Sequence, residues 1–266
     1  MVKPVVIIAA LAAEIAPLRR SLRARRSANV GDCTTWIAEV AGTEVVMLIC
    51  GMGSANATAA ATAVLALQPA VICSIGFGGA VRPGLEVGDL VQGEHIFTWD
   101  CSDTQPVPVP AMRPACPPSA GLRCATGSFL TVTGVADKLT VASLLPSDLP
   151  HPVLEMETAA IARVASNADI PCLVLRAISD TAEENLGFSL DEFCDHQLKL
   201  HPWRIMRTLA RKPQLIPQLI RLAHNCRLAA HSLAKGVYAL LPDLIHGDCR
   251  PENGGNLAGA PPARPD

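Results

Sequence analysis

Two stretches of the sequence carry acidic side chains where a strand gives way to another element. They contain Glu155, Met156, Glu157, Ser179 and Asp180. The first three residues follow a short apolar run and precede a helical pattern near Ala160, and the last two end an apolar strand that begins at Leu173. Ligands bind at the carboxyl ends of parallel strands in open α/β sheets, so we expect these acids to meet on one rim. The spacing therefore predicts a ligand site.

A third acid and a glycine-rich segment are further candidates for this site. Glu14 lies in the first turn of a helix expected from Leu11 to Leu22. A strand expected at Val71 to Ile75 ends in a segment, Gly76 to Gly79, that contains Phe77 and Gly78. Missing side chains there would let a flat ring approach the backbone, although a plain tight turn explains the glycines equally well.

Each feature, taken singly, is better explained by an ordinary structural role. Glu14 favours a helix N-terminus, and Glu157 and the Ser179-Asp180 pair are typical N-capping residues. Gly51-x-Gly53 suggests a dinucleotide-binding turn, but the third position is Asn56 and the acid expected at the next strand end is missing. Backbone amides at that helix start still suit an anion or a ribose hydroxyl.

The elements that must position these residues alternate between strand and helix. Apolar runs predict strands at 5–10, 71–75, 90–97 and 128–133, a hairpin from 34–40 and 44–50, and helices at 55–67 and 137–145. This alternation is typical of α/β proteins. We expect a three-layer α/β/α domain with a central mixed sheet over residues 1–195.

Two segments are expected to lack regular structure. Six of the 13 residues from Pro106 to Pro118 are proline, which predicts an extended loop. Residues 246–266 are rich in Gly, Pro and Asn, and we expect them to be disordered.

Residues 196–245 are expected to form a basic, amphipathic helical extension. From His196 to Pro242 there are eight basic and no acidic residues, interleaved with apolar ones at helical spacing. Amphipathicity alone favours packing on the domain or across a dimer, whereas the one-sided charge suits an anionic membrane surface. We predict reversible peripheral contact with anionic membrane, lost without the chain from about His201 onward while the acids are spared.

Composition excludes several classes of protein. Outside the basic stretch, 14 of the 22 basic residues remain against 24 acidic ones, which argues against nucleic-acid binding. The ten cysteines include no C-x-x-C pair, so we expect reduced thiols rather than disulfides or a zinc site. The first apolar run is explained by a strand, and no run approaches the ~20 residues of a membrane span. We therefore expect a cytoplasmic protein.

The order of the motifs resembles the nucleoside phosphorylase superfamily, in its methylthioadenosine/adenosylhomocysteine nucleosidase branch. The resemblance runs over roughly residues 4 to 195 and rests on Ala10-Leu11-Ala12-Ala13-Glu14, the glycine segment with Pro83, Val87-Gly88-Asp89, Glu155-Met156-Glu157 and Arg176-Ala177-Ile178-Ser179-Asp180. The tail, with Pro202-Trp203 and Arg211-Lys212-Pro213, is more loosely similar to hopanoid-associated phosphorylases.

The resemblance implies cleavage of the N-glycosidic bond of a purine nucleoside. The expected substrate is an adenosine derivative that is substituted at the 5′ position. The similarity of the tail implies an adenosylhopane-like nucleoside. Breaking the C1′–N9 bond leaves negative charge on the purine and positive charge on the ribose. Asp180 would therefore protonate N7, with Ser179 orienting it. Glu157 would hold the ribose hydroxyls and steady the cation.

The remaining roles follow from the same resemblance. Glu14 would position or deprotonate the attacking water, and Met156 would pack on the sugar. Glu155, Phe77 and Gly78 complete the predicted binding residues. The resemblance implies no metal or other cofactor, and it implies a homo-oligomer, expected to be a dimer.

The sequence departs from the nucleosidase pattern in ways that affect the nucleophile and the base pocket. Phe77 replaces a small polar residue, and no aromatic residue near Gly134 to Lys138 suits stacking on a base. A phosphorylase needs cations around its phosphate, and Arg82 is the nearest candidate. We favour water as the nucleophile, with phosphate as the alternative. A non-catalytic protein that holds a nucleoside or nucleotide is the rival interpretation, which retention of the three acids disfavours.

Overall fold

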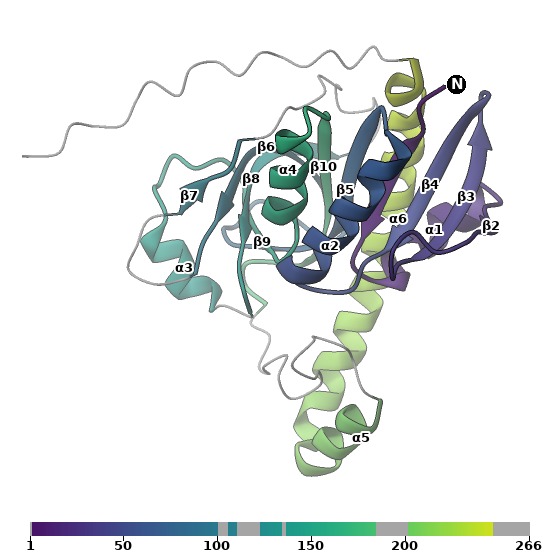
Figure 1. The fold of residues 1–266 in the computed structure, drawn as a ribbon. Helices are drawn as coiled ribbons and strands as arrows, with labels where there is room; N and C mark the ends of the chain where they lie inside the picture. Colours follow the sequence, from purple (N-terminus) through teal and green to yellow (C-terminus); the bar gives the residue numbers. More distant parts are fainter. Residues whose placement is uncertain (1, 101–105, 111–122, 135–136, 185–201, 247–266) are drawn as a thin grey trace, which may run out of the picture.

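The computed structural model describes residues 2–100, 106–110, 123–134, 137–184 and 202–246. Its strands are β1 (Val5–Ala9), β2 (Arg25–Arg26), β3 (Thr34–Val40), β4 (Thr43–Ile49), β5 (Val71–Ala80), β6 (Leu90–Thr98), β7 (Val107–Pro108), β8 (Cys124–Thr131), β9 (Pro152–Glu155) and β10 (Cys172–Asp180). Its helices are α1 (Ala12–Ser21), α2 (Ser54–Val64), α3 (Lys138–Leu144), α4 (Thr158–Asn167), α5 (Pro202–Arg211) and α6 (Ile216–His246), with 3₁₀ turns at Leu65–Leu67 and Pro213–Leu215. A mixed sheet lies between helices on both faces, which confirms the predicted three-layer architecture (Figure 1).

Strand β5 is the centre of the sheet. It pairs in parallel with β1 and β10 and in antiparallel with β9. Strand β10 continues through β6 and β8 back to β9, so these strands close a ring with β5. The other wing, β1-β4-β3-β2, stays open and contains the predicted hairpin, with Ala41 and Gly42 at φ 51° and 78° in its turn.

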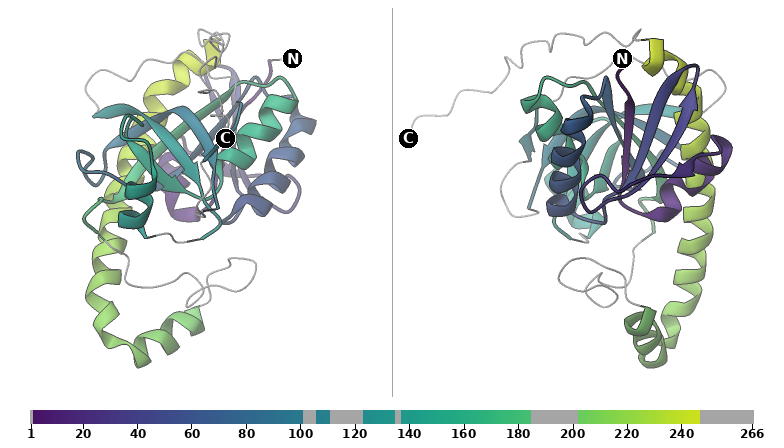
Figure 2. Two further views of the ribbon diagram at one scale, coloured as in Figure 1. Left: turned by 90° about the vertical axis from the view of Figure 1, so that its left-hand side faces the viewer. Right: turned by 45° about the vertical axis from the view of Figure 1, so that its right-hand side comes forward.

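The central strands are continuous apolar runs because helices cover both faces of the sheet. In β1, Val5 and Ile7 belong to the core beneath α1 and α6, whereas Val6 and Ile8 belong to the core beneath α2 and α4. Figure 2 shows α2 and α6 on opposite sides of the sheet. The alternation along one strand thus supplies the two apolar layers that hold the molecule together.

The glycine segment at 76–79 is not a turn. It continues β5 to Ala80 and pairs with β10 as far as Gly79, with a shift in register between Ile178 and Asp180. The predicted strand at Val71 to Ile75 is therefore too short, because glycine has a low propensity for strands and its run ends the apolar pattern. Here the glycines lie where neighbouring groups approach the strand closely.

Helix α6 has two parts with different surroundings. Ala229, Leu233, Val237 and Leu240 are buried against α1, β10 and β5, whereas the beginning of α6 and all of α5 project from the body of the molecule (Figures 1 and 2). The second part of the predicted extension therefore packs on the domain. Removing the chain from His201 onward would uncover this core, so we expect such a truncation to disturb the fold that positions the acids.

Some expectations lie wholly or partly outside the described residues. These are most of the proline-rich loop (101–105 and 111–122), the segment 185–201 with the predicted boundary at 195, and residues 247–266. Within the loop, β7 pairs with β6. The cysteines that the structure describes are free thiols, with Cys73 and Cys172 fully buried. None of the described helices combines the length and apolarity needed to cross a bilayer.

Candidate active site

Gly79 of β5 brings the two acid-bearing strands together. It pairs with Leu154 of β9 on one side and with Asp180 of β10 on the other. Strand β9 runs antiparallel to β5, so the acids do not meet at the ends of parallel strands as predicted. They meet because β9 pairs with the last two residues of β5, beside the end of β10.

A cavity of about 200 Å³ opens at this junction. It is lined by all the residues predicted for the site, namely Glu14, Phe77, Gly78, Glu155, Met156, Glu157, Ser179 and Asp180. Leu11, Met52, Val132 and Leu154 add apolar walls. A concave, largely apolar site with a few convergent polar groups is typical of small-molecule binding.

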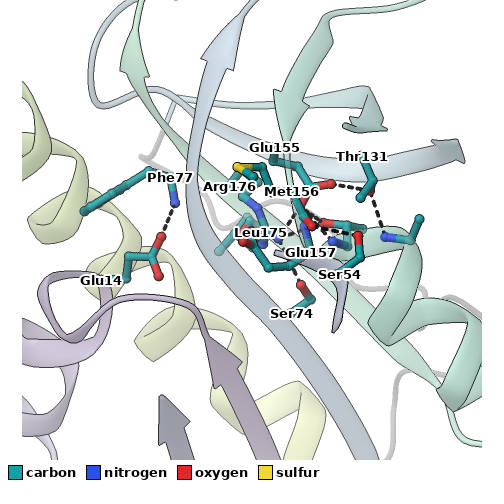
Figure 3. A network of polar contacts seen from close by, with 12 residues as sticks. Glu14, Ser54, Ser74, Phe77, Thr131, Glu155, Met156, Glu157, Leu175 and Arg176 are labelled. Atoms are coloured by element: carbon teal, nitrogen blue, oxygen red, sulfur yellow. Dashed lines mark hydrogen bonds and ion pairs between the residues drawn. The ribbon is translucent and has the colours of Figure 1, made fainter. Parts of the chain in front are cut away.

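Glu14 joins the first helix to the glycine-containing strand. Its Oε2 accepts a hydrogen bond from the Leu11 N–H at 2.7 Å. Its Oε1 accepts one from the Phe77 N–H at 2.9 Å (Figure 3). The first bond is the helix-capping role that the sequence suggested, and the second ties the acid to β5. Burial raises the pKa of Glu14, although both N–H groups favour its carboxylate form.

Glu155 and Arg176 form a buried ion pair behind the cavity. The Glu155 Oε2 accepts hydrogen bonds from Arg176 at 2.8 Å and from the N–H and hydroxyl of Thr158, each at 2.7 Å (Figure 3). Burial alone would raise the pKa of Glu155, but Arg176 and the hydrogen bonds outweigh it and lower the pKa. Because its carboxylate is engaged within the protein, the geometry favours a positioning role for Glu155 over the predicted contact with substrate.

Glu157 occupies the N-cap position of α4, but its side chain does not cap that helix. Its Oε1 accepts a hydrogen bond from the Gly53 N–H at 2.7 Å, so the start of α2 binds this carboxylate. The capping explanation is therefore wrong, and the anion expected at Gly53 is a side chain of the protein itself. Burial, followed by the charge of Glu155, raises the pKa of Glu157 to about 8.

Asp180 is the last residue of β10 and is 6% exposed. Its Oδ1 accepts a hydrogen bond from the Ser179 hydroxyl at 2.6 Å, and its Oδ2 forms an ion pair with the Lys138 ammonium group. Residues 181–184 continue as a turn rather than a helix, so the N-cap explanation for Ser179-Asp180 is wrong. Ser179 instead orients the Asp180 carboxylate.

Lys138 is the site residue that sequence reasoning missed. Among the described residues that line the cavity, it has the only cationic side chain. The available signal was its position directly after Asp137, at the start of a helix, where the helix dipole disfavours a cation.

Arg82, the candidate cation for phosphate, lies outside the cavity lining. Its guanidinium group donates to the backbone carbonyls of Leu145, Pro146, Ser147 and Leu149, at 2.8 to 3.3 Å. These bonds hold the segment after α3 against the end of β5. Arg82 is thus a structural residue, and its proposed part in phosphate binding is wrong.

Residues 4–209 match the family model of the phosphorylase superfamily, and the chain belongs to this family. The superfamily resemblance inferred from the motifs is confirmed. The structure is similar to that of the 5′-methylthioadenosine/S-adenosyl homocysteine nucleosidase of Helicobacter pylori, with a TM-score of 0.66 and 16% identity over 91% of this chain and 99% of that one.

Two further solved structures share the fold. The futalosine hydrolase of Helicobacter pylori has a TM-score of 0.66 and 16% identity over 91% of this chain and 99% of its own. The 5′-methylthioadenosine/S-adenosylhomocysteine nucleosidase of Neisseria meningitidis has a TM-score of 0.63 and 21% identity over 90% and 98% of the two chains. The relatives differ in name and share an architecture, which confirms the fold of this chain.

Proposed function

We propose that this protein cleaves the N-glycosidic bond of a purine nucleoside, with water as the nucleophile. The observation that carries the proposal is the gathering of Glu14, Glu157 and Asp180 around one cavity. Three acids suit the three demands of the reaction, which are a steadied ribosyl cation, a protonated leaving base and an activated water. The named activities of the nucleosidases and of the futalosine hydrolase that share the fold support this choice.

Glu157 is the group that we assign to the sugar. It lies in the cavity with one carboxylate oxygen held by Gly53. In its ionised form it opposes the positive charge that develops on the ribose, and it accepts hydrogen bonds from the sugar hydroxyls. Met156 lies beside it in the lining, where it packs on the sugar.

Asp180 and Glu14 are assigned to the leaving base and to the water. Ser179 fixes the orientation of the Asp180 side chain, which passes a proton to N7 of the purine. Glu14 is held from two sides by the N–H groups of Leu11 and Phe77. In its ionised form it removes a proton from the water that attacks C1′.

The charge of the cavity favours water over phosphate. Among the described lining residues, Lys138 is the sole cation against four carboxylates, and it is already paired with Asp180. A phosphate dianion is stabilised by cations and donors that face it, and Arg82 does not face this site. Phosphorolysis is therefore the less favoured alternative.

We infer that the substrate is an adenosine derivative with an apolar 5′ substituent. The apolar walls of the cavity suit such a group, and the nucleosidases of the same fold are named for 5′-methylthioadenosine. The looser similarity of the tail to hopanoid-associated phosphorylases adds an adenosylhopane-like nucleoside to the substrates to be tested.

The test is incubation of the full chain with adenosine and 5′-substituted adenosines, with and without inorganic phosphate. We expect free adenine together with free ribose or its 5′ derivative in both conditions. If ribose 1-phosphate forms, and adenine is released only when phosphate is present, the reaction is phosphorolysis and not hydrolysis. Tight binding of these nucleosides without release of adenine would favour the rival, non-catalytic protein.

The matched variants are Asp180→Asn and Asp148→Asn. Asp180→Asn should lower kcat by about 10²-fold or more, because a carboxamide cannot pass on a proton. Asp148 is exposed and lies outside the cavity lining, so its variant should behave as the wild type. Equal loss of activity in both variants would contradict the assignment.

A further inference from the structure

The Lys138 ammonium group binds three acceptors at the end of β10. Besides its ion pair with Asp180 Oδ2, Nζ donates to the backbone carbonyls of Asp180 at 3.2 Å and Thr181 at 2.6 Å. These three acceptors match the three N–H donors of a lysine. The lysine side chain is 9% exposed and the Asp180 side chain 8%, so the pair is shielded from solvent.

The Lys138–Asp180 pair needs a glycine beside it and places a cation at an unfavourable position of α3. A Cβ on Gly79 would lie 2.6 Å from Asp180 Oδ2 and 3.1 Å from Lys138 Cε, so a larger residue would displace both groups. Lys138 also begins α3, where a cation opposes the helix dipole. Burial of a charge is itself unfavourable. Stability of the helix therefore does not explain why a lysine stands here.

The pairing affects the chemistry of the leaving group. Both oxygens of the Asp180 side chain act as acceptors here, because Oδ2 contacts the Lys138 ammonium group and Oδ1 accepts from the Ser179 hydroxyl. The departing purine nevertheless needs a proton at N7. Within the described lining, the Lys138 ammonium group is in direct contact with Asp180 and holds a proton that it can give.

We propose that Lys138 acts through Asp180 as the source of the proton that reaches the leaving purine. This inference rests on the proposed N-glycosidic cleavage and names a residue that the three-acid scheme lacks. Lys138 is a positioning and proton-supplying residue, whereas Asp180 contacts the base.

The step balances as follows in atoms and charge. One proton moves from Lys138 Nζ to the Asp180 carboxylate and passes from Asp180 to N7, and the electron pair of the C1′–N9 bond goes to the purine. The oxygen of water bonds to C1′ and gives its proton to Glu14. Lysine is left as a neutral amine, and the proton on Glu14 returns through solvent to Nζ after the products leave.

Lys138→Arg separates proton supply from charge. Arginine keeps the positive charge beside Asp180 but does not release a proton in proteins. On the best 5′-substituted adenosine, we expect kcat to fall by about 10²-fold with KM within a few-fold of the wild type. The matched control, Lys235→Arg on the exposed face of α6, should change neither value.

The decisive comparison uses the N7-methylated form of the same nucleoside. Its base already carries a positive charge and leaves without a proton, so Lys138→Arg should cleave it at close to the wild-type rate. Should Lys138→Arg fail to fold, as judged by its melting temperature, Lys138→Gln carries the same expectation because an amide also supplies no proton. A selective loss on the unmethylated substrate supports the proposal.

Two results would overturn it. Near-native kcat of the arginine or glutamine variant on the unmethylated nucleoside would show that Asp180 needs no proton from a lysine. Equal losses on both nucleosides would make Lys138 a merely structural residue. If the wild-type protein releases no base from either nucleoside, the proposed function itself fails, which is a separate result from a failure of the Lys138 variants.

Discussion

Glu157 combines burial with a nearby like charge, and both effects act in the same direction. They raise its pKa to about 8, and the N–H of Gly53 compensates in part. Glu155, two residues away, is shifted the other way because Arg176 and hydroxyl groups surround it. The two neighbouring carboxylates thus have different surroundings, since Glu155 is paired within the protein and Glu157 lines the cavity.

A pH dependence follows from the raised pKa of Glu157. When the pH is below the Glu157 pKa of about 8, this residue is mainly protonated in the free protein. A neutral carboxyl group does not oppose a ribosyl cation. We therefore expect kcat/KM to fall about tenfold per pH unit below that value. The measurement is a pH profile of adenine release for the wild type and for Glu157→Gln, which should lower kcat and lose this limb. If the Gln variant raises KM and leaves kcat unchanged, Glu157 binds substrate without acting in catalysis.

At the scale of elements, β5 brings the site together. Its glycines allow Glu14, Val153 and the Asp180–Lys138 pair to approach the strand from different sides. A strand of larger residues would keep the same hydrogen bonds to β10 and β9 but would push these groups apart.

Gly76→Ala tests this role of β5. The new methyl group would lie 2.7 Å from Glu14 Oε1 and must displace that carboxylate. We expect kcat to fall about tenfold or more while the melting temperature changes little, because the strand accepts alanine. A double-mutant cycle with Glu14→Gln should be strongly non-additive, since both changes affect one group. Additive losses would mean that Gly76 acts independently of Glu14.

Substitutions in α6 test which part of this helix belongs to the core of the domain. Leu233 is fully buried in the core beneath α1 and α6, whereas Leu228 on the same helix is 47% exposed. Leu233→Ala should lower the free energy of unfolding by about 2–5 kcal/mol and Leu228→Ala by less than about 1 kcal/mol. Urea denaturation followed by circular dichroism measures both. Similar small effects would show that α6 is not part of the core.

The projecting part of the chain, formed by α5 and the beginning of α6, carries exposed apolar side chains. Trp203 and Met206 of α5 are 70% and 68% exposed, and Ile220 of α6 is 66% exposed. Exposed basic residues, Arg207, Arg211 and Lys212, lie along the same segment. The segment projects from the edge at which β1 ends and α2 and α4 begin (Figure 1). Leu11, Met52 and Glu157, which line the cavity, lie at these element ends.

We predict that this segment binds anionic membranes reversibly. Sedimentation with phosphatidylserine-containing vesicles at low salt should bring down the full-length protein, and high salt should release it. Replacing both Trp203 and Met206 by Ala, or Arg211 and Lys212 by Glu, should weaken binding at least about tenfold, because each basic residue contributes ~1 kcal/mol. Leu139→Ala, a change at a 74% exposed residue of α3, is the matched control.

The contrary outcome assigns the segment to a contact between copies of the chain. If vesicles bind no protein at low salt while the same variants convert a dimer into a monomer in analytical ultracentrifugation, the segment is a dimer interface. Either outcome leaves the core intact, because the substitutions lie outside the buried part of α6.

Residue types and their spacing predicted most of the central strands and the acids that line the cavity. Continuous apolar runs such as Val5 to Ala9 predicted strands covered on both faces, and the motif order predicted the family. These inferences succeeded because they depend on local periodicity and on residue types. The prediction that the strand ends at the glycine segment was wrong for the same reason. Local propensity cannot distinguish a turn from a strand that other groups approach closely.

The tertiary structure decided what each charged residue contacts. The antiparallel entry of β9 beside Gly79, the carbonyl contacts of Arg82 and the pairing of Lys138 with Asp180 all join residues that are distant in sequence. A charge in a protein is stabilised by the groups that surround it after folding. The distances between these groups cannot be predicted from a single sequence. Residue type thus identified the acids, whereas the packing of distant elements set their partners and protonation.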